Sequence, residues 1–162
     1  MNVHPHTLIV GLGSEILGDD GIGHRIVEKI SLLLNNPGIL FDTALCGGLD
    51  LLNAITGYDN VVLIDAIKGF RHIGNVESFP LEQFKETLHL SNVHEGTFKE
   101  LYLLGEMLGY KMPGNVLIIS VEITENEVFS EILSPEISCR FENICSTVIG
   151  IIQEKIHIPV TT

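Results

Sequence analysis

The sequence has no tryptophan, only nine Lys and Arg residues and only three cysteines in 162 residues. Its 21 Asp and Glu residues give a formal net charge of −12. Nucleic acids and anionic lipids are bound through clustered basic side chains, so this charge argues against both as partners. The cysteines, at positions 46, 139 and 145, include no Cys-x-x-Cys pair. This argues against a disulfide framework and a thiolate metal site, and we expect reduced thiols.

Long apolar runs are also missing, although 45% of the residues are apolar. Runs such as 61–64 and 116–119 fall far short of the roughly 20 residues that span a bilayer. The first seven residues lack the basic region and apolar stretch of a signal peptide. We therefore expect a cytoplasmic monomer without membrane contact, folded as one domain over residues 1–162, with the apolar residues in its core.

Apolar runs of strand length alternate with segments of helical period. The pattern predicts strands at 7–10, 39–42, 61–64 and 116–121, and an edge strand at 74–79. Helices are predicted at 21–34, 50–56 and 97–108, with a last one beginning at Pro135. This order predicts an α/β three-layer sandwich whose mainly parallel, roughly five-stranded twisted sheet is flanked by helices.

The residues that follow the strands carry the functional information, because ligands of such sheets bind beyond the carboxyl ends of the strands. Gly11-Leu12-Gly13 begins like a dinucleotide fingerprint, but Ile16 stands where its third glycine should be. Asp19 and Asp20 open the next helix, where a phosphate would need positive potential, so we exclude a phosphate cradle. One acid is enough to cap a helix, which leaves a second carboxylate for a function at the sheet edge.

A further acid and a histidine lie in the same predicted region. Asp65 directly follows the most apolar strand, where it either caps a turn or serves a metal or proton-transfer role. His94 lies in the polar segment 88–95, and His89 competes with it for any role. Two carboxylates and one imidazole form a mixed oxygen and nitrogen set that suits a borderline divalent cation such as nickel or zinc.

Other kinds of chemistry have weaker support in the sequence. Ser14 lacks the Gly-x-Ser-x-Gly pattern of a nucleophile elbow. The glycine turn at 46–48 offers open backbone amides beside which an extended peptide can lie. An alternative of a different class is a non-catalytic α/β domain that binds a small ligand or has a regulatory role. Such a domain would use the acids only as helix caps. That alternative predicts that Asp20→Ala and Asp65→Ala change stability alone.

The sequence resembles the [NiFe]-hydrogenase maturation proteases in several blocks that keep the family's order. The strongest block is 8–23, LIVGLGSEILGDDGIG, and the others are CGGLDLL at 46–52, VLIDA at 62–66, His94 before a helix, and LSPE at 133–136. The family usually has Asn at the position of Ser14. A spore-germination-type protease of similar fold is a remoter alternative.

The resemblance implies an endopeptidase that trims the C-terminal extension of a hydrogenase large-subunit precursor. It places the metal contacts on Asp20, Asp65 and His94, and it implies that they recognise nickel already installed in the precursor. The protease would then need no permanent metal or cofactor of its own. Asp20 or Asp65 would act as general base, or the metal would polarise the scissile carbonyl.

Overall fold

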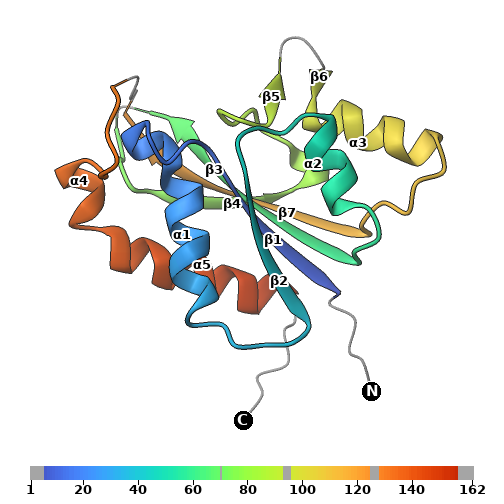
Figure 1. Ribbon diagram of the computed structural model, residues 1–162, viewed down its shortest axis with the longest axis horizontal. Coiled ribbons are helices and arrows are strands. Elements are labelled where there is room, and N and C mark those ends of the chain that lie inside the picture. Colours follow the sequence, from blue (N-terminus) through green and yellow to red (C-terminus); the bar gives the residue numbers. More distant parts are fainter. Residues whose placement is uncertain (1–5, 70, 93–95, 125–127, 157–162) are drawn as a thin grey trace.

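A five-stranded sheet with the order β2-β1-β3-β7-β4 forms the centre of the molecule (Figure 1). The structure is a computed structural model that describes residues 6–69, 71–92, 96–124 and 128–156. The strands of the sheet are β1 (Thr7–Leu12), β2 (Ile39–Ala44), β3 (Asn60–Lys68), β4 (Val76–Pro80) and β7 (Asn115–Ile123). All pairings are parallel except that of β4 with β7 at one edge. The predicted mainly parallel, five-stranded sheet and its edge strand are confirmed, and the antiparallel direction of that edge strand is a finding of the structure.

Helices cover both faces of the sheet. One layer contains α1 (Ile22–Ser31), α4 (Pro135–Ser138) and α5 (Phe141–Ile156), and the other contains α2 (Leu49–Ile55) and α3 (Phe98–Met107). The short strands β5 (Ser91–Asn92) and β6 (Gly96–Thr97) form a separate pair before α3. Two 3-10 helices are also present in the described residues, η1 (Gly18–Gly21) and η2 (Leu81–Gln83). None of the helices in the described ranges is long and apolar enough to cross a membrane.

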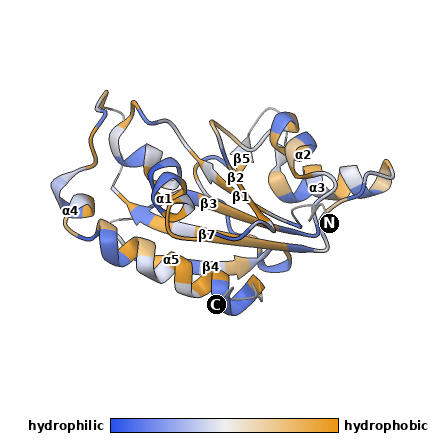
Figure 2. Ribbon diagram, turned by 60° about the horizontal axis from the view of Figure 1, so that its bottom comes forward, coloured by the Kyte–Doolittle hydropathy of each residue, from blue (hydrophilic) through white to orange (hydrophobic). Residues whose placement is uncertain are grey.

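The sheet residues alternate between two apolar cores. Val62 and Ile64 pack with α1 and α5 on one face, whereas Val61 and Leu63 pack with α2 and α3 on the other. A parallel sheet that is buried on both faces needs apolar residues at successive positions, and the central strands are accordingly mostly apolar in Figure 2. The apolar residues, which make up 45% of the chain, therefore form two packed cores, one on each face of the sheet.

Helix α1 packs so closely against the sheet that backbone atoms of the helix and the strands approach one another. A Cβ atom on Gly23 would lie 2.4 Å from the carbonyl oxygen of Ile64 and 2.6 Å from that of Leu12. On the opposite side of the contact, a Cβ atom on Gly11 would lie 2.2 Å from the carbonyl oxygen of Gly23. These glycines bring the start of α1, and η1 before it, directly onto the carboxyl ends of β1 and β3.

Several predicted boundaries are wrong. The helix predicted at 21–34 ends at Ser31, and the edge strand predicted at 74–79 lies at Val76–Pro80. The strand predicted at 61–64 continues past Asp65 to Lys68, because β7 still pairs with β3 up to the pair Lys68 and Ile123. The helix predicted from Pro135 is divided into α4 and α5. The amide of Arg140 donates to the carbonyl of Ile137, three residues back, which tightens the chain at this point. The Arg140 guanidinium also donates to the carbonyl of Ile73, 2.9 Å away.

Candidate functional site

Asp65 lies where two neighbouring strands part. β1 pairs with β3 only as far as the pair Gly11 and Ile64, whereas β7 stays paired with β3 beyond that point. Asp65 is therefore the first residue of β3 without a neighbour on β1. Its side chain is fully buried at 0% exposure. The parting of the strands gives this carboxylate room at the carboxyl edge of the sheet, where ligands of α/β proteins bind.

Four donors surround the Asp65 carboxylate. Oδ2 accepts hydrogen bonds from the Thr87 hydroxyl at 2.5 Å and from the His89 amide at 2.8 Å. Oδ1 accepts from the Ala66 amide at 2.8 Å and lies 2.6 Å from Nδ1 of the His89 ring. A buried carboxylate is tolerated only when its oxygens are satisfied in this way. The Asp65 carboxylate is thus held in one orientation.

Asp20 approaches the same histidine from the other side of the ring. Its two oxygens lie 3.0 and 3.1 Å from Nε2 of His89. Oδ2 also accepts a hydrogen bond from the Ser14 amide at 3.0 Å, in the loop that follows β1. Burial by itself raises the pKa of Asp20, but these hydrogen bonds and the positive charges of His89 and Lys68 lower it below its usual value.

The His89 ring therefore bridges two carboxylates. Burial disfavours the charged ring, but the hydrogen bonds to Asp20 and Asp65 and their negative charges raise the pKa of His89 to about 10. The ring is an imidazolium at neutral pH, with Nδ1–H donating to Asp65 and Nε2–H donating to Asp20. We name Asp20, Asp65 and His89 the rim cluster.

The structure thus brings together both predicted carboxylates and the histidine that competed with His94. His94 itself lies outside the described residues. Sequence reasoning did not identify Thr87, whose hydroxyl contacts Asp65. No local signal could have found it, because the segment 84–90 has neither strand nor helix period and is positioned by its contact with Asp65.

The capping interpretation of the acids in η1 is wrong. Neither Asp19 nor Asp20 makes a side-chain hydrogen bond to the start of η1 or α1. Asp19 is 1% exposed, and its Oδ1 accepts a hydrogen bond at 2.7 Å from the amide of Ser134, which precedes α4. Asp19 therefore ties the end of the loop 128–134 to η1, and Asp20 is the acid that faces the sheet edge.

The glycine turn after β2 has a different role from the one expected. The Gly47 amide donates to the carbonyl of His89 at 2.7 Å, so it is not open to a peptide. A Cβ atom on Gly47 would lie 2.7 Å from the same carbonyl oxygen, which explains why glycine is needed there. The turn supports the backbone of His89.

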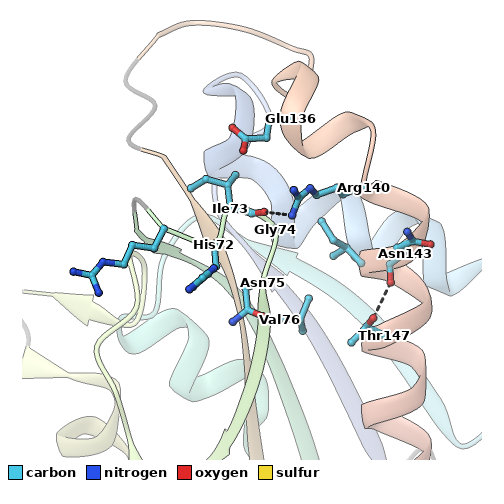
Figure 3. A pocket seen from close by; sticks show the side chains of 11 residues that line it. His72, Ile73, Gly74, Asn75, Val76, Glu136, Arg140, Asn143 and Thr147 are labelled. Carbon is cyan, nitrogen blue, oxygen red and sulfur yellow. Dashed lines mark hydrogen bonds between the residues drawn. The ribbon is translucent and has the colours of Figure 1, made fainter.

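A large cavity lies away from the rim cluster (Figure 3). It encloses about 590 Å³ between the turn that precedes β4 and the helices α4 and α5, and His72, Glu136 and Arg140 are among the residues that line it. None of Asp20, Asp65 and His89 lines it. This cavity and the rim cluster are therefore separate features.

The charge on His89 makes stability depend on pH in a predictable direction. Below its usual pKa of 6.5 the ring is protonated in both states, and the stabilisation is fully present. Between pH 6.5 and about 10 only the folded protein keeps the proton, so the free energy of unfolding falls as the pH rises. We expect this fall to be on the order of 1 kcal/mol per pH unit and to be absent in His89→Gln. Urea unfolding across this range measures it, and equal slopes in both proteins would contradict the prediction.

Comparison with known proteins assigns the family. The model of the hydrogenase maturation protease family matches residues 25–151. The hydrogenase expression/formation protein HupD of Thiocapsa roseopersicina is 28% identical over 146 residues, which make up 86% of this chain and 64% of that protein. The chain therefore spans slightly less than two thirds of that relative.

Solved structures share the fold. The hydrogenase maturating endopeptidase HybD from E. coli superposes with a TM-score of 0.67 at 20% identity, over 91% of this chain and 92% of that one. The [NiFe] hydrogenase maturation protease HycI from Thermococcus kodakarensis superposes with a TM-score of 0.64 at 22% identity, over 92% and 93% of the two chains. With a family model that matches most of its length, this chain belongs to the hydrogenase maturation protease family.

Proposed function

We propose that this protein is an endopeptidase that removes the C-terminal extension of a nickel-loaded [NiFe]-hydrogenase large-subunit precursor. The observation that carries the proposal is the rim cluster, where two carboxylates and an imidazole converge at the carboxyl edge of the sheet. Membership of the hydrogenase maturation protease family supports the choice of substrate. The protein would act in the cytoplasm, as a monomer.

Nickel enters this proposal as part of the substrate. Carboxylate oxygens and an imidazole nitrogen suit a borderline divalent cation, and the rim cluster offers too few ligands to hold one firmly alone. It can complete the coordination shell of an ion that precursor thiolates already hold. The loaded precursor then binds better than the unloaded one, and this difference makes the protease a checkpoint for metal insertion.

His89 and nickel compete for the same place between the carboxylates. In the free protein the imidazolium supplies the positive charge that Asp20 and Asp65 require. A divalent ion brought by the precursor would replace that charge, and the ring would release one proton to solvent and offer the freed nitrogen to the metal. The resemblance assigns the imidazole to His94, whereas the contacts of Asp20 and Asp65 support His89.

The two carboxylates are suited to different tasks. Every oxygen of Asp65 has two close partners and no exposure, so Asp65 positions the histidine and would contact the metal only where the His89 ring gives up its place at Oδ1. Asp20 keeps 16% of its side chain exposed and is ionised at neutral pH. We assign Asp20 as the general base that takes a proton from the attacking water and returns it to the leaving amine. The precursor's nickel polarises the scissile carbonyl.

Processing of purified precursor tests this function. We expect the protein to shorten a nickel-loaded large-subunit precursor and to leave the nickel-free precursor intact, as measured by intact mass. Failure to shorten any nickel-loaded precursor would refute the proposal. Equal cleavage of both forms would refute the role of nickel.

The same assay identifies the histidine that acts. His89→Ala and His94→Ala are compared with His72→Ala, which removes an exposed histidine of the turn before β4. We expect the histidine that contacts nickel to be required and His72→Ala to process normally. Normal processing by both of the first two variants would exclude an imidazole contact.

A further inference from the structure

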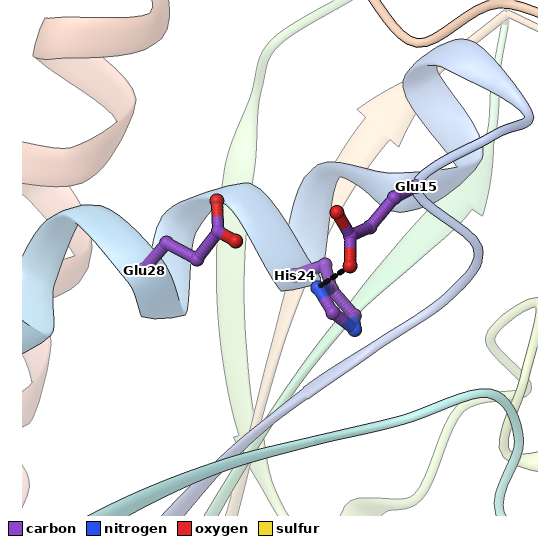
Figure 4. Close-up of side chains that lie close together, drawn as sticks. All are labelled: Glu15, His24 and Glu28. Atoms are coloured by element: carbon purple, nitrogen blue, oxygen red, sulfur yellow. Dashed lines mark ion pairs between the residues drawn. The ribbon is translucent and has the colours of Figure 1, made fainter.

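A second group of metal-binding side chains lies on helix α1, outside the rim cluster. Glu15 comes from the loop after β1, and His24 and Glu28 are four residues apart on one side of α1 (Figure 4). One ligand atom from each lies within 4.8 Å of the other two. Residues four apart on a helix face the same way, so this convergence follows from the helix and from the path of the loop.

The His24 ring is the feature that points to a ligand. Its side chain is only 15% exposed, and Nδ1 lies 3.1 Å from Oε1 of Glu15. Nδ1 is buried, and its contact with Glu15 is an ion pair whose geometry does not make a hydrogen bond. A buried ring nitrogen without a hydrogen bond is costly. A cation between the ring and the carboxylates would satisfy this nitrogen and both acids together.

We propose that Glu15, His24 and Glu28 form a binding site for a first-row divalent cation, for which Zn²⁺ is the probe. Imidazole nitrogen and carboxylate oxygen are both zinc ligands, and three is the number of protein ligands in a zinc site that keeps an open position. The site is distinct from the rim cluster in its residues, and it does not depend on the proposed protease activity.

A neighbouring cation competes for one of the ligands. Nη1 of Arg25 lies 3.9 Å from Oε2 of Glu28, a long contact at a side chain that is 55% exposed. Nη2 of Arg25 donates instead to the carbonyl of Glu131. Exposed pairs of this kind contribute little to stability, so a divalent ion can displace Arg25 from Glu28.

An ion at this site would fix the loop that supports Asp20. Glu15 is next to Ser14, whose amide donates to Oδ2 of Asp20. Binding would therefore join this loop to the middle of α1 and stabilise the folded state by mass action. We expect Zn²⁺ to raise the midpoint of thermal unfolding as its concentration increases.

Zinc titration of the full chain after treatment with a chelator tests the proposal. The double variant Glu15→Gln with Glu28→Gln removes both acids of the site. The control, Glu77→Gln with Glu142→Gln, removes the same charge at two acids that are 54% and 75% exposed. Removing a residue that only hydrogen-bonds to a metal ligand already lowers metal affinity by about 10- to 100-fold. We therefore expect zinc affinity to fall at least tenfold in the first variant and to stay unchanged in the control.

Histidine ring resonances of the unmutated protein give a second readout that does not depend on how a variant folds. We expect Zn²⁺ to shift the Nδ1 signal of His24. An unshifted His24 signal, or equal zinc affinity in the two double variants, would overturn the proposal, and so would zinc bound only at the rim cluster.

Discussion

Replacing Asp65 by Asn should reduce the rate of precursor processing by about 10²- to 10⁴-fold, the range over which a positioned proton-transfer system contributes. The substitution keeps the shape of the side chain but removes the charge that holds the imidazolium of His89. It also turns one oxygen into an NH₂ group. That group would face donors, because the Thr87 hydroxyl and the Ala66 amide both donate to this carboxylate.

Initial rates on nickel-loaded precursor measure this effect, with circular dichroism used to confirm that the variant is folded. Glu86→Gln is the matched control, because Glu86 is exposed and close in sequence to His89. We expect the control to retain the rate of the unmutated protein. A folded Asp65→Asn protein that keeps its rate within tenfold would show that processing does not need Asp65 to position His89.

Adding one methyl group to Gly23 should destabilise the fold by about 3 kcal/mol, the upper part of the usual range for overpacking. The new Cβ would lie 2.4 Å from the carbonyl oxygen of Ile64 and 2.8 Å from the amide nitrogen of Leu12. Backbone atoms of buried strands cannot move aside as the end of a flexible side chain can. Helix α1 must therefore shift as a unit, and η1 with Asp20 would move with it.

Gly150→Ala is the matched control and should act in the opposite direction. Gly150 lies inside α5, and a Cβ atom there would meet nothing within 4 Å. Alanine in a helix interior is more favourable than glycine by roughly 0.5–1 kcal/mol. Urea unfolding of both variants measures the contrast. If Gly23→Ala were as stable as Gly150→Ala, the backbone contact between α1 and the sheet would not be as close as described.

Much of the fold could be predicted because its elements have local causes. Buried parallel strands consist of short apolar runs that can be recognised in the sequence. Helix α3 begins with a capping box formed by Thr97 and Glu100. The position of Asp65 at the sheet edge followed from the same logic. The continuation of β3 past Asp65 could not be predicted, because it depends on pairing with β7 about 50 residues later in the sequence.

The partners within the candidate site were harder to predict than its acids. Asp20 lies after β1, and Asp65 lies in β3 just beyond its pairing with β1, so the topology of the sheet sets their neighbourhood. His89 lies in a segment without regular structure, and its place is set by contacts with Asp65 and Gly47. Periodicity carries no information about such a segment, which is why the sequence left His89 and His94 as alternatives.

The backbone of His89 is held at both of its polar groups, by the Asp65 carboxylate at its N–H and by the Gly47 amide at its carbonyl. Together with the contact between its ring and Asp20, these bonds join the loops that follow β1 and β2 to strand β3 as one unit. The entropy of arranging these groups is thus lost during folding and not during substrate binding. Under the proposed function, a precursor that docks at this edge would meet groups that are already in place, so little of its binding free energy would be spent on arranging them.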